Sequence, residues 1–345
     1  MMNVEKKVLV DGVPFIYAVS LVEVDGRPYY AAASENREGK AFLIDCETEE
    51  VFSLPDGPGG IMTFVKAAGE SAMFSIEQFF PVFDSALAKI VKTDLHRSGD
   101  QIMAVRRVLA EVPYVHRIAQ LQEADGTFLA AGILCKHKER SDDWSTPGSL
   151  KIGRYDPNME QLSLETVYEG VFKHHAMQIR KNEAGCDELF FGGTEGCFRT
   201  VRSRQDWVTE RLLDVPTSDI AIFDLDGDGQ EELAIIEGFH GDNVAVFKEE
   251  KGGFRRVLDL PASFGHVLWS GTLLGAPALV VGSRANGKEL ILYRLKRGAD
   301  GRMSVVQQTE LDRGQAPAQI WVGENTGPII ATNHDVGELA KYSFS

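Results

Sequence analysis

Three histidines occupy equivalent places in a pattern that recurs along the chain. His116, His175 and His266 each stand at the start of an apolar, strand-like run that follows a short phrase ending in Val/Leu-Pro or Gly. Imidazole nitrogens that converge from several repeats can bind a divalent transition metal such as zinc or manganese and leave one position open for a substrate. We therefore expect these three residues to be the ligands of one metal ion.

The other repeats carry different residues in the same register. These are Tyr17, Gly60, Asp219 and Ala318. Tyr17 and Asp219 could add a hydroxyl and a carboxylate to the chemistry of the histidines, so we place both in the catalytic group. We also place His240 and His334 there, as the base or acid beside the metal.

A second set of polar residues lies in the loops between the second and third strands of the repeats. In this topology those loops reach the same face as the histidines, and we expect them to bind substrate. The set comprises Glu35, Arg37, Glu77, His137, Glu195, Asp242, Arg284, Asn333, Asp335 and, on a long insert, Trp144, which could stack on a sugar ring. The alternative is that these loops are polar only because turns favour such residues.

The repeat itself predicts the elements that position these residues. The phrase occurs seven times between Leu9 and Glu310, roughly every 50 residues, which is typical of β-propeller blades that bury their faces against their neighbours. Each repeat contains four short β-branched and aromatic runs separated by Gly, Asn and Asp turns. We predict an all-β, seven-bladed propeller of four-stranded blades, formed as a single domain by residues 1–345.

The ends of the chain predict how the ring closes. The last repeat supplies only three strands, while the N-terminal VEKKVLVDG resembles the outer-strand phrases of other repeats. We expect Val4 to Val10 to pair with Leu339 to Phe344, so that no sheet edge stays open. Inserts at Phe79 to Lys89 and Lys136 to Gly148 are candidate lids or rim loops.

An acidic loop in the fifth repeat has the spacing of a hard-cation site. Its alternating oxygen groups can wrap Ca²⁺ or Mg²⁺. The expected ligands are Asp224, Asp226, Asp228, the Gln230 carbonyl and Glu232. The segment IAIFDLDGDGQEELAIIEG resembles the FG-GAP or VCBS-like propeller repeats, and the resemblance implies that the loop is a structural clip within one blade.

Charge and hydropathy restrict the partners. The net charge is −15, so a nucleic acid would be repelled, and no apolar run has the length of a signal peptide or a membrane span. We expect a cytoplasmic protein that binds neither nucleic acid nor membrane. The sequence does not determine its oligomeric state.

Two classes of function fit these residues. The first is a metal-dependent lyase, dehydratase or isomerase that acts on a small carbohydrate or keto-sugar derivative at the channel mouth. The blade pattern also resembles the propeller part of the aldos-2-ulose dehydratases. The second is a non-catalytic propeller that binds a sugar or a protein partner, which the fold serves equally well. A quinone-dependent redox enzyme fits less well, because no matching ring of Arg and Lys is evident.

Overall fold

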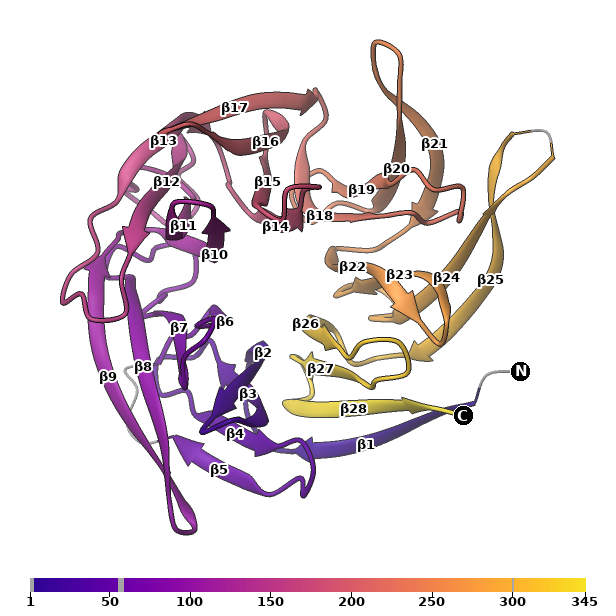
Figure 1. The fold of residues 1–345 in the computed structure, drawn as a ribbon. Helices are drawn as coiled ribbons and strands as arrows, with labels where there is room; N and C mark the ends of the chain where they lie inside the picture. The colour runs from indigo at the N-terminus through magenta and orange to yellow at the C-terminus, as the bar shows by residue number, and fades with distance from the viewer. Residues whose placement is uncertain (1–2, 55–58, 300) are drawn as a thin grey trace.

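The described residues fold as antiparallel β-sheets. The computed structural model describes residues 3–54, 59–299 and 301–345, so Pro55 to Pro58 of the second recurring phrase lie outside the described residues. Within those ranges the chain forms 28 strands and no helix, hence no helix that is long and apolar enough to cross a membrane. The strands make seven sheets of four, set like blades around a central channel (Figure 1). The predicted seven-bladed propeller is confirmed.

Each blade runs from an inner strand at the channel to an outer strand at the rim. The inner strands of blades one to seven are β2 (Ile16–Val24), β6 (Thr63–Lys66), β10 (Val115–Glu123), β14 (Ala176–Lys181), β18 (Thr217–Phe223), β22 (Gly265–Leu273) and β26 (Pro317–Val322). The second strands are β3 (Arg27–Ser34), β7 (Ala72–Glu77), β11 (Gly126–Ile133), β15 (Asp187–Gly193), β19 (Glu232–Glu237), β23 (Ala276–Ser283) and β27 (Ile329–Asn333). The third strands are β4 (Ala41–Asp45), β8 (Lys89–Ser98), β12 (Gly148–Tyr155), β16 (Gly196–Ser203), β20 (Asn243–Glu250), β24 (Leu290–Arg297) and β28 (Glu338–Phe344). The outer strands are β5 (Val51–Leu54), β9 (Gln101–Glu111), β13 (Glu165–Val171), β17 (Asp206–Leu213), β21 (Gly253–Pro261), β25 (Met303–Asp312) and, in blade seven, β1 (Val4–Val10).

The hydrophobic core lies between neighbouring blades. Val22 of blade one, for example, belongs to the same buried cluster as Phe64 and Met73 of blade two. The second strands are buried on both faces, and in β3 small side chains from Ala31 to Ala33 let the two adjacent blades approach closely. Each blade therefore depends on both of its neighbours for burial.

The two ends of the chain close the ring. Strand β1 pairs antiparallel with β28, with Val4 opposite Phe344 and Val10 opposite Leu339. Figure 1 shows the two strands side by side at the outside of the last blade. The predicted closure is confirmed, and β28 has a paired neighbour on both sides.

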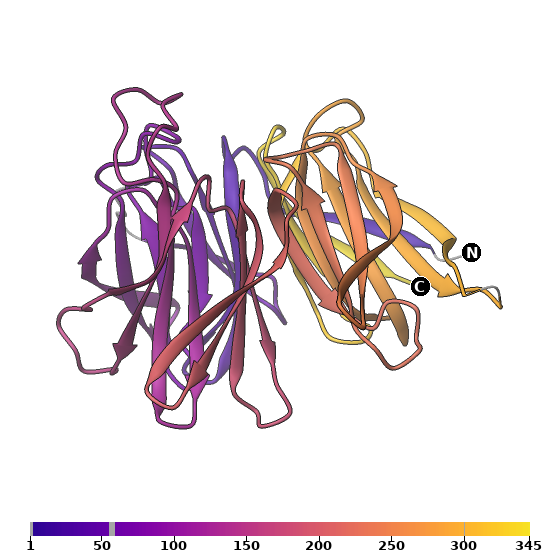
Figure 2. The same cartoon turned by 90° about the horizontal axis from the view of Figure 1, so that it is seen from above.

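A bulge recurs where the inner strands enter from one face of the ring. In β2, β10, β18 and β22 the pairing with the second strand skips one residue, which is Tyr17, His116, Ser218 and His266 respectively. A bulge turns a side chain out of the regular alternation of a strand. Seen at 90° (Figure 2), the strands run between the two faces and the connecting loops gather at them.

Removal of β1 tests the closure. A protein that lacks residues 1–10 exposes the edge of β28 and the apolar groups that β1 covers, so we expect its Tm to fall by about 10 °C or more and its aggregation to increase. A synthetic peptide of residues 1–10 should restore part of the Tm. An unchanged Tm in the truncated protein would contradict a role for β1 in holding the ring together.

Candidate functional site

Most of the residues that the sequence aligned at the start of the inner strands lie at one mouth of the channel. Tyr17, His116, His175 and His266 line a single pocket there. Two positions differ from the sequence alignment: Met62 takes the place expected for Gly60, and Ser218 takes the place expected for Asp219. Blade five is shifted by one residue because the bulge falls at Ser218, which moves Asp219 further into the channel.

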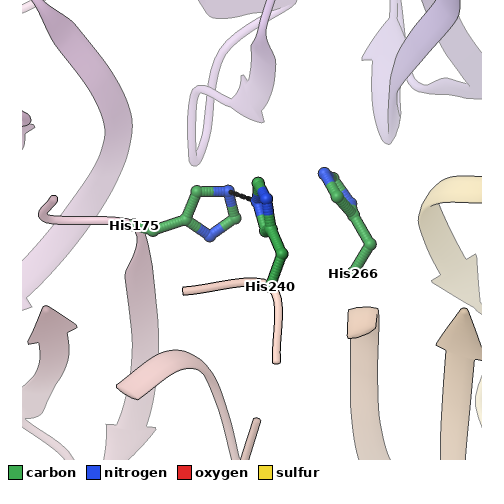
Figure 3. A group of neighbouring side chains, drawn as sticks. All are labelled: His175, His240 and His266. Atoms are coloured by element: carbon green, nitrogen blue, oxygen red, sulfur yellow. Dashed lines mark hydrogen bonds between the residues drawn. The ribbon is translucent and has the colours of Figure 1, made fainter. Parts of the chain in front are cut away.

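Three imidazoles converge at this mouth. One potential ligand atom from each of His175, His240 and His266 lies within 4.8 Å of the other two. Figure 3 shows the ring of His240 between the other two, and its Nε2 lies 3.1 Å from Nε2 of His175. Two nitrogens of a tetrahedral zinc site, each about 2.0 to 2.1 Å from the metal, are separated by roughly this distance. The donor set therefore fits a transition metal.

Backbone carbonyls fix two of these rings. Nδ1 of His175 donates to the Ser218 carbonyl at 2.7 Å, and Nδ1 of His266 donates to the Ala318 carbonyl at 2.7 Å. Both carbonyls belong to the next blade and stand in the same register as the histidines. This arrangement leaves the lone pair on Nε2 of each ring and is usual for metal-ligating histidines.

His116 lies beside this group without the same support. Its ring centroid is 4.5 Å from that of His175, and its side chain is buried, but its Nδ1 has no hydrogen-bond partner among the described residues. Arg117 Nε donates to the His175 carbonyl at 3.0 Å and so takes the acceptor that the pattern would assign to His116. The converging trio contains His240, which we had expected to be a base or acid, in place of His116.

Burial keeps the rings neutral. It lowers the pKa of His116, His175 and His266 well below the ordinary value, and it lowers the pKa of His240 to about 3. Neutral imidazole is the form that ligates metals. Burial also raises the pKa of Tyr17 to about 12, so its hydroxyl stays protonated, 3.2 Å from Nε2 of His266.

His334 forms a second polar group on the other side of Tyr17. Its Nε2 lies 2.8 Å from the Glu35 carboxylate, and its Nδ1 lies 2.8 Å from the Arg284 guanidinium and 2.9 Å from the Asp335 carboxylate. Arg284 can only donate to Nδ1 and Asp335 can only accept from it. The ring therefore has one set of partners when neutral and another when protonated, which suits a group that transfers protons.

The pocket between these groups is large enough for a small molecule. Its volume is about 300 Å³, and its charged lining residues are Glu35, Arg284 and Asp335. Loops between second and third strands supply all three, as the sequence predicted. Apolar residues complete the wall, and sequence reasoning missed them: Met62, Val82, Phe83, Phe264 and Ala285. Only the insert around Phe83 gave a signal, through its extra length.

Trp144 packs behind the lining of the mouth pocket and does not present the stacking surface that the sequence suggested. It contacts Phe83 and Phe239, each with ring centroids 5.8 Å from its own, and the ammonium of Lys138 lies 3.2 Å from its ring centre. Phe239 in turn stacks on His240. The two long inserts thus meet at an aromatic cluster that supports one side of the histidine group.

Several predicted substrate residues have structural partners elsewhere. Glu77 is buried, accepts from the hydroxyl of Ser75 and forms an ion pair with Arg106. Asn333 is also buried and donates to the Tyr342 hydroxyl at 3.1 Å. None of these side chains lines the mouth pocket.

Other loop residues hold the rim together. The Glu195 carboxylate accepts from the Phe172 amide at 2.8 Å, and the Asp242 carboxylate accepts from the Phe264 amide at 2.9 Å. His137 is exposed, and its backbone amide donates to the hydroxyl of Thr146. The guanidinium of Arg37 lies over the ring of Phe80, in a neighbouring depression lined also by Glu35.

The acidic loop of blade five contains a cation of its own. Lys248 Nζ lies 2.7 Å from Asp228 and 2.6 Å from Glu232, and it also reaches Asp226 at 3.5 Å. Asp224 accepts from loop amides, including that of Gly227, and the Gln230 amide donates to Asp228. Burial by itself would lower the pKa of Lys248, but its hydrogen bonds to Asp228 and Glu232 raise it.

The Lys248 ammonium contacts carboxylates that we expected to bind a hard cation. Oxygens of Asp224, Asp226 and Glu232 lie close enough to share an ion. Calcium or magnesium at this loop stays a prediction, and either ion would compete with Lys248 for the same carboxylates.

Comparisons with known proteins identify the fold and nothing finer. No protein-family model and no curated protein matches the sequence. Among solved structures, BBS1N in complex with ARL6DN matches with a TM-score of 0.58 at 13% identity, covering 99% of this chain and 95% of that one. Sqt1 of Saccharomyces cerevisiae matches with a TM-score of 0.54 at 12% identity, covering 96% and 85%. The resemblance to FG-GAP repeats and to the dehydratases therefore rests on the blade pattern and the blade-five motif alone.

The buried histidines predict how stability depends on pH. In the metal-free protein we expect the Tm to fall as the pH is lowered from about 6.5 to 5, because unfolded histidine titrates near 6.5 whereas the folded pKa is about 4 for His174 and about 3 for His240. In this window the unfolded chain binds more protons, so protons favour unfolding. Asp219, whose pKa burial raises to about 6, opposes the trend by one proton only.

The measurement is Tm against pH by circular dichroism in the presence of a chelator. His174→Gln should reduce the slope, because it removes one of the buried rings whose pKa is lowered. A Tm that stays constant or rises between pH 6.5 and 5 would show that the histidines do not remain neutral in the folded state.

Proposed function

We propose that the mouth pocket binds a divalent transition metal through His175, His240 and His266. The observation that carries the proposal is the convergence of three neutral imidazoles, with nitrogens within 4.8 Å of one another. The carbonyl contacts of His175 and His266 support it, because they direct Nε2 of each ring away from the backbone that holds it. Imidazole ligands suit zinc, whereas manganese prefers oxygen ligands, so zinc is the better fit to this donor set.

The charge of the pocket indicates the class of ligand. With His334 neutral, Glu35 and Asp335 against Arg284 give the lining a net charge of −1, which a divalent ion changes to +1. A small anion would then complete the charge balance, and Arg284 would hold its carboxylate. We infer that the ligand is a sugar acid or a keto-sugar derivative in its anionic form.

Lyase or isomerase chemistry is the catalytic form of this proposal. The metal would acidify a C–H bond next to the bound carbonyl or carboxylate, and His334 would accept that proton. For a dehydration, the electron pair of the C–H bond forms the double bond while the β-hydroxyl leaves, and the proton on His334 converts it to water. Tyr17 is protonated at neutral pH and would donate a hydrogen bond to the ligand.

A second candidate is a module that binds a protein partner at the same face. Phe15, Val82, Phe264 and Val336 are exposed side chains around the mouth. One of the similar propellers was solved in complex with ARL6DN, which is a property of that protein. A protein partner on this apolar rim would need no metal, so metal dependence separates the two candidates.

Metal analysis tests the first step. The purified protein dialysed against zinc or manganese should retain about one ion per chain at the mouth. His175→Ala should weaken this binding by about 100-fold or more, because it removes a direct ligand. The exposed His137→Ala is the matched control and should bind metal normally. Equal metal content in the two variants would contradict the site.

Anion binding tests the second step. Isothermal titration with gluconate and 2-ketogluconate should show binding to the zinc-loaded protein that is about 10-fold or more tighter than binding after chelation. Arg284→Gln should weaken binding by about 10-fold or more, the effect of one hydrogen bond to a charged group. Turnover would appear as the ultraviolet absorbance of a conjugated carbonyl product. Equal binding with and without metal would contradict the proposal and favour the metal-free module.

A further inference from the structure

A second chamber lies in the channel just beyond the histidine group. It has a volume of about 320 Å³ and is lined by residues that follow the entry bulge in several inner strands. His266 contributes to both this chamber and the mouth pocket. The polar residues of its wall are Thr63, Arg117, Gln178, Asp219, His266 and Gln319.

Arg117 brings a positive charge that the protein only partly satisfies. Its Nε donates to the His175 carbonyl at 3.0 Å, which holds the side chain against the next blade. Among the described residues no carboxylate forms an ion pair with it, although a guanidinium has five N–H donors and is always charged. Its remaining donors are those that a planar carboxylate would accept in pairs.

Asp219 supplies an opposite charge at the same level of the channel. Arg117 and Asp219 are each the first paired residue after the bulge, two blades apart, opposite Gly132 and Ile236 of their second strands. Asp219 accepts from the Ile220 amide at 3.0 Å. Within the described chain the two charges do not form an ion pair with each other. A ligand that carries an acceptor at one end and a donor at the other can bridge them.

Thr63 places a buried hydroxyl without a partner on the wall of this chamber. It is only 8% exposed, and its buried hydroxyl has no hydrogen-bond partner among the described residues. A buried hydroxyl without a partner costs free energy, so such groups usually contact something. Gln319, by contrast, is already held by the Val19 amide and the Met62 carbonyl.

We propose that this chamber binds a small carboxylic acid with a hydroxyl or ammonium group on the adjacent carbon. The carboxylate binds Arg117, and the hydroxyl or ammonium donates to Asp219. The hydroxyl of Thr63 serves as a further hydrogen-bonding group on the wall. This binding requires no metal, and it is therefore independent of the proposed function of the mouth.

The test uses glycolate, glycine and acetate as probes on the full-length protein kept in a chelator. Saturation-transfer NMR and titration should show that glycolate and glycine bind about 10-fold more tightly than acetate, which lacks the second group. Arg117→Gln should weaken all three probes by about 10-fold or more. Asp219→Asn should abolish the advantage of glycine over acetate.

Control variants assign the binding to this chamber. Arg284→Gln changes the mouth only and should leave probe affinity unchanged. If Arg117→Gln fails to fold by circular dichroism, Arg117→Lys and the nearly isosteric Thr63→Val replace it, and both should weaken glycolate. Absence of probe binding, a response to Arg284→Gln, or wild-type affinity in the Arg117 and Thr63 variants overturns the proposal. Because metal is absent throughout, failure of the mouth metal site would leave these results unaffected.

Discussion

The propeller depends on mutual burial between neighbouring blades, since no blade has a core of its own. Val22 shares a buried cluster with Phe64 and Met73 of the next blade, and similar clusters join other neighbouring blades around the ring. An open ring would leave one blade with an uncovered face and a free edge. The pairing of β1 with β28 removes that edge by joining the two ends of the chain. The rigid channel that results holds residues from distant repeats at fixed separations.

The entry bulges turn this symmetric frame into a site. They place side chains from several blades around one mouth. Because the backbone repeats from blade to blade, His175 and His266 donate to backbone carbonyls at equivalent positions of the next blade. Burial of several imidazoles in one mouth disfavours their charged form. His116 is the extreme case, because Arg117 has taken its acceptor. Such groups are stabilised when a ligand completes them.

The blade-five loop and the channel show opposite solutions to the same electrostatic problem. In the loop, Lys248 lies within hydrogen-bonding distance of Asp228 and Glu232, so the chain supplies the cation that its carboxylates require. At the mouth and in the channel, the described residues give Arg117 and Asp219 no ion pair and leave Nδ1 of His116 without a hydrogen-bond partner. The second situation is the one expected of binding sites, because the missing interactions are left for a ligand.

The sequence by itself determined the repeat, the number of blades, the closing strand and the register that carries Tyr17, His175 and His266. These features depend on local strand patterns that each blade repeats, and such patterns are readable one segment at a time. It also indicated that the loops carrying Glu35, Arg284 and Asp335 reach the mouth, because topology alone sends them there.

Only the tertiary structure decided which side chains meet. His240 replaced His116 in the converging trio because its loop folds over the mouth, and one bulge at Ser218 moved Asp219 into the channel. Glu77 pairs with Arg106, and Trp144 packs against Phe83 and Phe239. Lys248 forms ion pairs with carboxylates of the acidic loop. These pairings depend on distances between side chains that are far apart in the sequence, and the position of Asp219 depends on a bulge of a single residue. Strand periodicity carries no information about such distances or about the bulge.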